Sequence, residues 1–410
     1  MKSLYEDLMW RGLIQDCSNP EELKNQLDNN KLSFYIGTDP TADSLHIGHY
    51  PSFLLAKRLV NYGHHGIMLV GGATAQIGDP RGTGERSLLP LEVVNANYEK
   101  LKKQVERIFG CETVNNYDWI KNISTLEFLR DYGKHFPINY MLSKDKVKKQ
   151  LDNGLSFTEF SYMILQALDF KYLHDNKGVT LQVAGSDQWG NITSGIELIR
   201  RTEGVETYAF TMPLILDENG KKIGKSEGNA MWLDRDKTSP YELYQYLLNT
   251  DDSVVINHLK TMTLLDKEEI EKIEKEQLEA PHLRVAQKAL AKAVICDVHS
   301  EEDYNSVMKI SEALFSGKLK ELTKEEILDA FKNIPSYEVN EDKNIITLLV
   351  EAGICSSNRE AREFVNNKAI SVNGEILNDI NADIRQDDSL VDNYTIIRKG
   401  KKKYFVIKHV

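Results

Sequence analysis

Two histidines and two lysines are the first residues of this chain whose types and spacing could do chemistry. The histidines lie in His46-Ile47-Gly48-His49, after an apolar run that ends at Gly37 and a turn that contains Pro40. A helix that begins here would direct backbone N–H groups toward an anion, and two imidazoles can donate hydrogen bonds to phosphate or ribose oxygens. Gly48 would let an adenine ring lie against the backbone. Taken alone, the pattern fits two surface histidines at a helix start equally well.

The lysines lie in the polar segment from Asp217 to Ser226, three residues apart at Lys222 and Lys225. Lysine is a flexible point charge that can follow negative charge as it develops on a triphosphate. Taken alone, such a loop is usually a solvated turn. Downstream of the histidine pair, however, Lys222-Ile223-Gly224-Lys225-Ser226 resembles the second half of the paired signature of class I aminoacyl-tRNA synthetases.

Tyr162, Gln166 and Asp169 form a polar triplet that a helix would place on one face, because they stand four and three residues apart. A stripe that faces the core would be apolar. This triplet, flanked by apolar residues, therefore predicts a lined pocket. The alternative is a hydrogen-bonded contact between two helices.

Three further segments resemble bacterial-type tyrosyl-tRNA synthetases in order and spacing: 71–80, 156–169 and 185–192. The resemblance extends along essentially the whole chain. It implies activation of L-tyrosine by ATP, with Mg²⁺ accompanying the ATP and no tightly bound cofactor, followed by transfer to the 3′ end of tRNA(Tyr). It also implies a homodimer.

The resemblance assigns roles to individual residues. Around tyrosine it implies Tyr35 and Asp169 at the phenolic hydroxyl, Asp79, Tyr162 and Gln166 at the α-ammonium group, and Gln188 at the carboxylate. Around ATP it implies Gly37, Asp39, His46, Gly48, His49, Gly185, Asp187 and Lys225. The residues expected to stabilise the α-phosphate and the departing pyrophosphate are Thr41, His46, His49, Arg86, Lys222 and Lys225. No metal ligand and no nucleophilic side chain is expected, because the substrate carboxylate itself attacks.

Two positions depart from the family pattern. The segment Arg81-Gly82-Thr83-Gly84-Glu85 stands where the family has a lysine-bearing loop before Arg86. We therefore expect that pyrophosphate contact to be lost or taken over by Arg81. Ile36 replaces a cysteine that is often found beside the ribose, so a side-chain hydrogen bond is absent there. Asn116 is a weaker candidate on the ribose side.

The elements that must position these residues follow from the apolar pattern. Short apolar runs at 33–37, 66–72 and 179–183 alternate with amphipathic stretches. This predicts parallel strands joined by right-handed helical crossovers, and hence a Rossmann-like doubly wound sheet. Such sheets bind ligands at the carboxyl ends of their strands, where each run leads into a polar or Gly-rich turn. We place this α/β catalytic domain at 1–237, including the Lys222–Ser226 loop.

Beyond this domain the pattern changes. Lys, Glu, Leu and Ala recur with helical spacing from Glu242 to about Phe331, which predicts an all-helical, anticodon-side domain at 238–333. Ser239 before Pro240 is typical of a helix N-cap. The pattern breaks at 334–341, which we interpret as a linker, and 342–410 is predicted to form a small α+β domain.

This last domain resembles the S4 RNA-binding module in 357–365 and 369–375. Arg359 and Arg362 would share one helix face, where guanidinium groups can bind phosphates, and Asn373-Gly374 suits a hairpin turn. The alternative is a solvated helix and an ordinary turn. The expected RNA contacts are Arg359, Arg362, Arg398, Lys401, Lys402 and Lys403.

Composition and charge exclude several classes of protein. A formal net charge of −11 argues against non-specific attraction to nucleic acid, although the tail from Arg398 to Lys403 is locally basic. The amino-terminal residues are unlike a signal peptide, and no stretch approaches a membrane span, so we expect a cytoplasmic protein that does not bind membranes. The four cysteines form no Cys-x-x-Cys pair, so neither a disulfide framework nor a zinc site is indicated.

Two other functions remain open from the residues. A tryptophanyl-type synthetase would share both class I motifs, although Tyr35 with Asp169 suits a phenol better than an indole. A non-catalytic, structured-RNA-binding scaffold of the same fold would not need His46, Lys222 or Asp187. By resemblance, the homodimer interface is expected at about 126–157.

Overall fold

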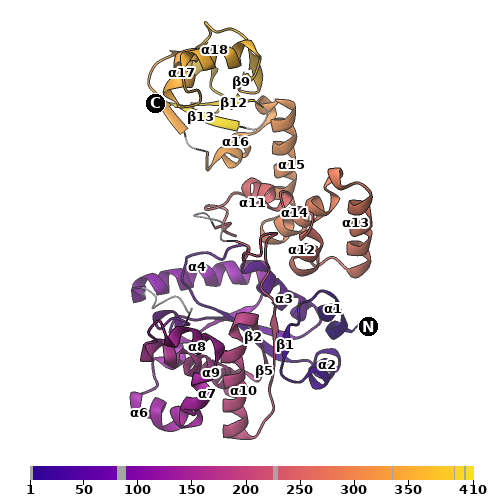
Figure 1. Cartoon of the computed structure of the whole chain (residues 1–410), viewed down its shortest axis with the longest axis vertical. Coiled ribbons are helices and arrows are strands. Elements are labelled where there is room, and N and C mark those ends of the chain that lie inside the picture. Colours follow the sequence, from indigo (N-terminus) through magenta and orange to yellow (C-terminus); the bar gives the residue numbers. More distant parts are fainter. Residues whose placement is uncertain (1–2, 81–88, 225–229, 335, 392, 401–402) are drawn as a thin grey trace. The chain divides into compact units, whose positions relative to one another are not determined.

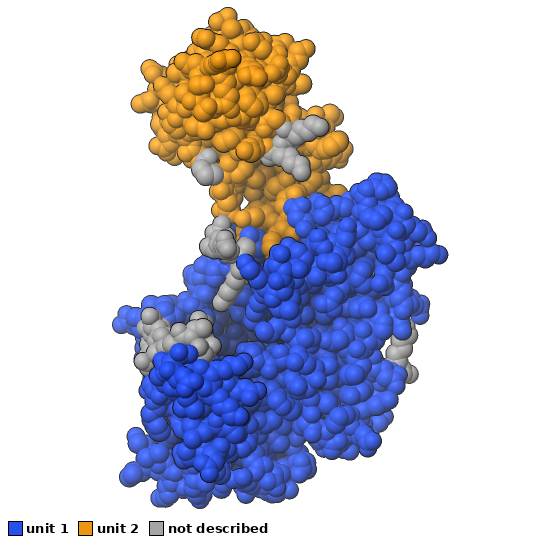
Figure 2. Space-filling model, in the orientation of Figure 1, with its two compact units in different colours: residues 1–237, 247–294 blue, residues 238–246, 295–410 orange. Residues whose placement is uncertain are grey.

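The computed structural model describes residues 3–80, 89–224, 230–334, 336–391, 393–400 and 403–410. These residues divide into two compact units, which Figure 2 distinguishes by colour. Unit 1 contains Met1–Lys237 and Leu247–Val294, and unit 2 contains Thr238–Tyr246 and Ile295–Val410. The helical segment is therefore shared between the two units. The division into a catalytic, a helical and an S4-like domain stays a prediction.

Unit 1 is built on a six-stranded sheet (Figure 1). The strands follow in the spatial order β1 (Asp16–Cys17), β6 (Tyr208–Met212), β5 (Val179–Gly185), β2 (Ser33–Thr38), β3 (His65–Val70) and β4 (Glu112–Asn115). All neighbours are parallel except β1 and β6. The predicted doubly wound sheet is confirmed. Strand order reverses between β2 and β5, which makes this position the switch point where such sheets bind ligands.

Helices cover both faces of this sheet. The helices α3 (Tyr50–Asn61) and α4 (Leu91–Phe109) pack on β3, while α9 (Phe157–Lys177) and α10 (Trp189–Glu203) pack on each other and on β5. Right-handed crossovers in opposite directions from the switch point require these two pairs to lie on opposite faces. The other α-helices with residues in unit 1 are α1 (Leu4–Trp10), α2 (Pro20–Asn29), α5 (Tyr117–Ile120), α6 (Thr125–Glu127), α7 (Ile138–Leu142), α8 (Asp145–Leu151), α11 (Pro240–Leu248), α12 (Val255–Met262), α13 (Lys267–Glu279) and α14 (Val285–Val298).

The long helix α9 begins and ends at residues that suit its termini. Ser156 caps it, since its Oγ accepts the N–H of Glu159 at 3.2 Å. The helix stops at Gly178, whose φ of 64° is a left-handed conformation that glycine adopts readily. Phe170 of α9 packs against Tyr35 of β2, with ring centroids 5.5 Å apart. The helix is thereby fixed against the strand that leads into the switch point.

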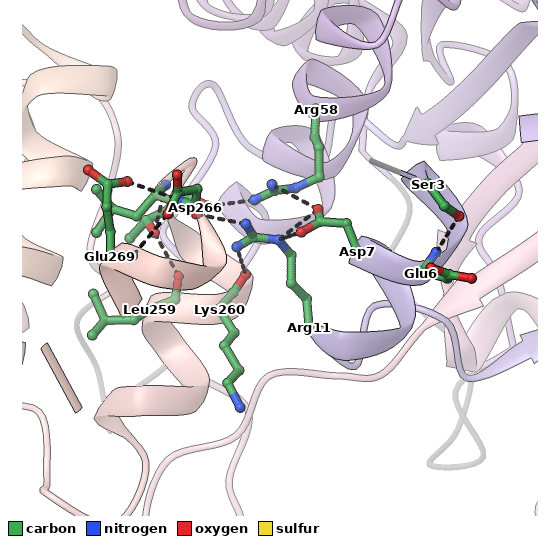
Figure 3. Close-up of polar contacts among 11 residues, drawn as sticks. Ser3, Glu6, Asp7, Arg11, Arg58, Leu259, Lys260, Asp266 and Glu269 are labelled. Carbon is green, nitrogen blue, oxygen red and sulfur yellow. Dashed lines mark hydrogen bonds and ion pairs between the residues drawn. The ribbon is translucent and has the colours of Figure 1, made fainter. Parts of the chain in front are cut away.

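Two buried arginines, Arg11 and Arg58, bind the carboxyl end of α12 (Figure 3). Their guanidinium groups donate to three carbonyl oxygens at or just after the end of this helix: those of Lys260 (3.0 Å), Thr263 (2.5 Å) and Leu265 (2.7 Å). Carbonyls at a helix end lack intrahelical partners, so buried cations here satisfy groups that would otherwise be unpaired. In its middle, α12 also contacts the chain before the lysine loop, since His258 Nε2 lies 3.1 Å from the carbonyl oxygen of Leu216.

Asp7 supplies the counter-charge for both arginines. Its Oδ2 lies 2.9 Å from Arg11 Nε and 3.4 Å from Arg58 Nη1. Burial lowers the pKa of Arg58 to about 10, so the group stays charged at neutral pH. Asp7 therefore holds two cations that the fold has withdrawn from water.

Asp7→Asn should lower the free energy of unfolding by about 3 kcal/mol, because two buried guanidinium groups would lose their counter-charge. Urea unfolding of the full chain measures this. Glu6→Gln is the matched control, because it removes only the exposed pair with Lys24 (2.8 Å) and should barely move the unfolding midpoint. Similar losses in the two variants would contradict the role given to Asp7.

Unit 2 contains a five-stranded sheet in the order β10 (Glu375–Leu377), β9 (Ile370–Val372), β12 (Tyr394–Lys399), β13 (Lys403–His409) and β7 (Ser336–Val339). A second, two-stranded sheet pairs β8 (Lys343–Asn344) with β11 (Asp383–Ile384). The α-helices that lie wholly in unit 2 are α15 (Glu301–Ser316), α16 (Lys324–Phe331), α17 (Ile345–Glu351) and α18 (Asn358–Asn366). The N-cap predicted at Ser239 is present, since its Oγ accepts the N–H of Glu242 at 3.2 Å.

The segment 334–341, interpreted above as a linker, contains a strand. β7 pairs in parallel with β13, and Val339 is buried in a cluster against which Tyr337 packs. The strand is only four residues long, and Tyr337 and Val339 are two inward-facing residues two positions apart. So short an alternating pattern did not stand out in the sequence. The hairpin expected at Asn373-Gly374 is confirmed: it joins β9 to β10, and both residues have positive φ.

None of the described helices combines the length and the apolar composition that crossing a bilayer requires.

Candidate active site

A cavity of about 530 Å³ lies at the carboxyl ends of β2 and β5, at the switch point of the sheet. Most of the site residues predicted from the sequence line it: Tyr35, Gly37, Asp39, Thr41, Gly48, His49, Asp79, Tyr162, Gln166, Asp169, Gly185, Asp187, Gln188 and Lys222. His46 is 6% exposed and stacks on His49, which lines the cavity. Arg86, Lys225 and the segment 81–85 lie outside the described residues. The polar triplet of α9 thus faces a pocket, and the individual roles stay predictions.

The two histidines stack, with ring centroids 3.8 Å apart. The Nδ1 of His46 accepts the N–H of Gly48 at 3.0 Å, and the Nδ1 of His49 accepts the N–H of His46 at 3.2 Å. A neutral ring that accepts at Nδ1 carries its proton on Nε2. Both imidazoles are therefore hydrogen-bond donors at Nε2, at the amino-terminal end of α3.

Gly48, between the two histidines, lies close to the backbone of Ile223 in the lysine-bearing segment. A Cβ at this position would lie 2.5 Å from the carbonyl oxygen of Ile223 and 2.9 Å from the His46 ring, so only glycine allows the approach. Residues 217–221, which precede Lys222, form a short hairpin closed by the bridge between Leu216 and Lys222. The two motifs, which stand far apart in the sequence, are in direct contact.

Asp169 is buried and bound by donors that the sequence did not reveal. Its Oδ1 accepts the indole N–H of Trp119 at 2.9 Å, and its Oδ2 accepts from the amide of Asn116 at 3.0 Å. Burial raises the pKa of Asp169 to about 8, although the two donors oppose the shift. The ribose-side role considered for Asn116 is wrong: the side chain is fully buried outside the cavity and also bonds Thr74 and the N–H of Ala73.

Tyr35 contributes a hydroxyl for which no partner is found among the described residues. The ring is 2% exposed, and the hydroxyl is buried without a hydrogen bond. Burial, and secondarily the nearby Asp169, raises the pKa of Tyr35 well above its usual value, so the group is a neutral phenol. An unpaired buried hydroxyl costs free energy, which a ligand with a matching polar group would recover.

Asp39 and Tyr162 both line the cavity and are joined by a direct hydrogen bond. The Tyr162 hydroxyl donates to Asp39 Oδ2 at 3.2 Å, and Thr74 donates to Asp39 Oδ1 at 2.7 Å. Gly71 makes room for this pair, since a Cβ there would lie 2.1 Å from Thr74 Oγ1. The carboxylate after β2 is thereby held in place.

Asp79 is bound by three donors. Lys146 lies 2.5 Å and Gln188 3.0 Å from its Oδ2, and Asn191 lies 3.1 Å from its Oδ1. Gln188 also donates to Asp187 at 3.0 Å. This network connects the carboxylate expected at the amino group with the one expected at the ribose.

Sequence reasoning missed four residues of these networks. Thr74 and Asn191 lie in segments that carried the family resemblance, so they could have been named from it. For Trp119 the available signal was general: a buried indole N–H normally has an acceptor. Nothing in the sequence pointed to Lys146, because it lies in a surface-like run of charged residues.

The expected RNA-binding residues lie in unit 2. Arg359 and Arg362 are exposed on α18, three residues apart and therefore on one face. Lys403 is exposed at the start of β13, and Arg398 is partly buried near the end of β12. Lys401 and Lys402 lie outside the described residues.

The raised pKa of Asp169 gives stability a pH dependence. An unfolded aspartate titrates near pH 4, so between about pH 4 and 8 the folded chain retains a proton that the unfolded chain has released. Stability should therefore fall as the pH rises, by at most about 1.4 kcal/mol per pH unit from this group. Asp169→Asn should flatten the decline between pH 6 and 8 in urea unfolding, whereas equal slopes would contradict the buried, protonated carboxyl.

Comparison with known proteins agrees with this geometry. Residues 27–316 match the family model of class I tRNA synthetases (W and Y), and residues 326–407 match the tyrosine–tRNA ligase SYY-like C-terminal domain. The tyrosine–tRNA ligase of Staphylococcus carnosus is 51% identical over 415 residues, which cover 99% of both chains.

Solved structures extend the comparison. A truncated mitochondrial tyrosyl-tRNA synthetase of Aspergillus nidulans has a TM-score of 0.69 and 33% identity, covering 77% of this chain and 95% of that one. A tryptophanyl-tRNA synthetase of Encephalitozoon cuniculi has a TM-score of 0.55 at 15% identity over 74% of this chain and 87% of that one, which shows a shared fold alone. With matches over nearly its whole length, the chain belongs to the bacterial-type tyrosine–tRNA ligases, a family of class I aminoacyl-tRNA synthetases.

Proposed function

We propose that the cavity forms tyrosyl-adenylate from L-tyrosine and ATP, and that the chain then transfers tyrosine to the 3′ end of tRNA(Tyr). The observation that carries this proposal is the buried hydroxyl of Tyr35, which has no hydrogen-bond partner in the described part of the chain and lies in the same cavity as Asp169. A phenolic hydroxyl fits both groups. The identity of 51% with a tyrosine–tRNA ligase supports tyrosine over the tryptophan alternative, and supports an enzyme over a non-catalytic scaffold.

The phenol can pair with Tyr35 and Asp169 in either protonation state of the carboxyl group. When Asp169 is ionised, the substrate hydroxyl donates to it and accepts from Tyr35. When Asp169 is protonated, as its pKa of about 8 favours at neutral pH, it donates to the substrate, which in turn donates to Tyr35. Phenylalanine would leave the Tyr35 hydroxyl without a partner and would offer Asp169 no hydrogen bond beyond those from Trp119 and Asn116. This penalty is the proposed basis of selection.

ATP would bind along the amino-terminal end of α3. His49 and Lys222 line the cavity, and an imidazole Nε2–H and a flexible ammonium group can both donate to phosphate oxygens. Asp187 follows β5, where a carboxylate can accept from ribose hydroxyls. Mg²⁺ would enter with ATP as part of the substrate. The tyrosine carboxylate attacks the α-phosphorus, so the protein acts by positioning and charge stabilisation.

Transfer requires that tRNA(Tyr) also bind the chain. The exposed pair Arg359 and Arg362 on α18 supports binding of RNA phosphates by unit 2, because guanidinium groups can bind phosphates in a bidentate manner. We place the protein in the cytoplasm, where aminoacylated tRNA is consumed.

The segment around 126–157 supports the proposed homodimer. It exposes apolar side chains that a monomer would normally bury: Leu126 is 78%, Ile138 59% and Phe157 71% exposed. Such residues gathered in one short segment are typical of a protein interface. A second copy of this chain is the proposed occupant.

Leu126→Glu should convert the dimer to a monomer, because it would bury a carboxylate in an apolar interface. Sedimentation velocity at micromolar concentration measures the mass. Leu278→Glu, at a side chain that is 76% exposed on α13, is the control and should leave the mass unchanged. A dimer that persists in Leu126→Glu and Phe157→Glu would place the interface elsewhere.

Tyr35→Phe should weaken tyrosine binding about tenfold, because the phenol would lose one hydrogen bond in a desolvated site. Phenylalanine binding should not weaken, so selectivity in ATP–pyrophosphate exchange should fall by a similar factor.

Lys222→Ala should instead slow the exchange at saturating tyrosine with little change in tyrosine affinity. The reverse pattern would reject the assignment, and no exchange with any amino acid in the wild type would reject the function.

A further inference from the structure

Lys146 contacts two carboxylates of the cavity wall. Its Nζ lies 2.5 Å from Asp79 Oδ2 and 3.5 Å from Asp187 Oδ2, and the side chain lines the cavity with 30% of its surface exposed. Asp79 is the residue proposed to hold the α-ammonium group of tyrosine. A primary ammonium group of the protein itself therefore occupies a position proposed for the substrate.

Asp79 has little capacity left for a further donor. An ionised carboxylate offers about four acceptor sites, and Lys146, Gln188 and Asn191 occupy three of them. Of these three described donors, the two amides are neutral and Lys146 alone carries a charge. The substrate ammonium group, which needs the same charge-assisted bond, competes with Lys146 more directly than with either amide.

The local backbone gives no reason for a cation at this position. Lys146 is the second residue of α8, and the positive end of a helix dipole disfavours cations in the first turn. Lys148 and Lys149 of the same helix are exposed and lie in its last turn, where a cation is favoured. The negative charges of Asp79 and Asp187 offset the unfavourable placement of this cation in the first turn of the helix.

We propose that Lys146 is a built-in competitor for the amino group of the substrate, and thereby a specificity-determining residue of the tyrosine site. Lys146 leaves Asp79 as the amino group arrives and retains Asp187, which it already approaches. A phenol that lacks an amino group makes no such exchange. This inference rests on the proposed function, because it concerns the ammonium contact of the same site.

The test compares two ligands that differ only in the amino group: L-tyrosine and 3-(4-hydroxyphenyl)propanoate. Isothermal titration calorimetry on the full chain gives the dissociation constant of each. In Lys146→Met, which removes the charge and keeps most of the stem, the affinity ratio of tyrosine to the propanoate should rise about tenfold, because a competing charge-assisted bond is gone. Tyramine, which has the amino group without the carboxylate, should bind more tightly to the variant than to the wild type.

Matched variants separate this role from a structural one. Lys148→Met makes the same charge change on the same helix and should leave the ratio unchanged, and Lys146→Arg should restore it. Lys146→Gln provides a second neutral side chain if the methionine variant folds poorly. A ratio that stays constant or falls in both neutral variants overturns the proposal. A wild type that binds neither ligand overturns the proposed function instead.

Discussion

The cavity holds several carboxylates in one partly desolvated space, and the surrounding elements are arranged to supply their donors. Asp39 accepts hydrogen bonds from side chains of α9 and of the turn after β3. Asp79 accepts them from side chains of α8 and α10, and Asp169 from side chains of the segment after β4. A buried acceptor without donors would cost several kcal/mol, comparable to a large part of the stability of a domain. The need to pair these groups therefore explains why segments far apart in the sequence converge on the switch point.

Much of this architecture was predictable, because it depends on local rules. The apolar runs at 33–37 and 179–183 are strands because their residues are buried on both faces of a parallel sheet. The triplet on α9 faces the cavity because helical periodicity sets which residues share a face. The cap at Ser239 follows from the chemistry of the first turn.

The remaining features depend on contacts that no local pattern records. Asn116 was considered for the ribose, yet its side chain bonds Thr74 and Asp169, which lie 42 and 53 residues away along the chain. In the sequence, Lys146 cannot be distinguished from the charged residues around it, because its partner Asp79 lies 67 residues away along the chain. The strand β7 exists only because β13, near the end of the chain, offers it an edge. Contacts between distant parts of the chain determined the places of Asn116, Lys146 and β7, and local residue propensity did not.

The double attachment of α12 restricts how this part of the chain can change over evolution. One side chain in the middle of the helix meets the carbonyl of Leu216, while the end of the helix is bound by Arg11 and Arg58. Each residue advances a helix by about 100° of rotation. A single insertion or deletion between these two points would turn one contact away from its partner, so we expect homologues to vary in sequence here but to conserve the length of the helix.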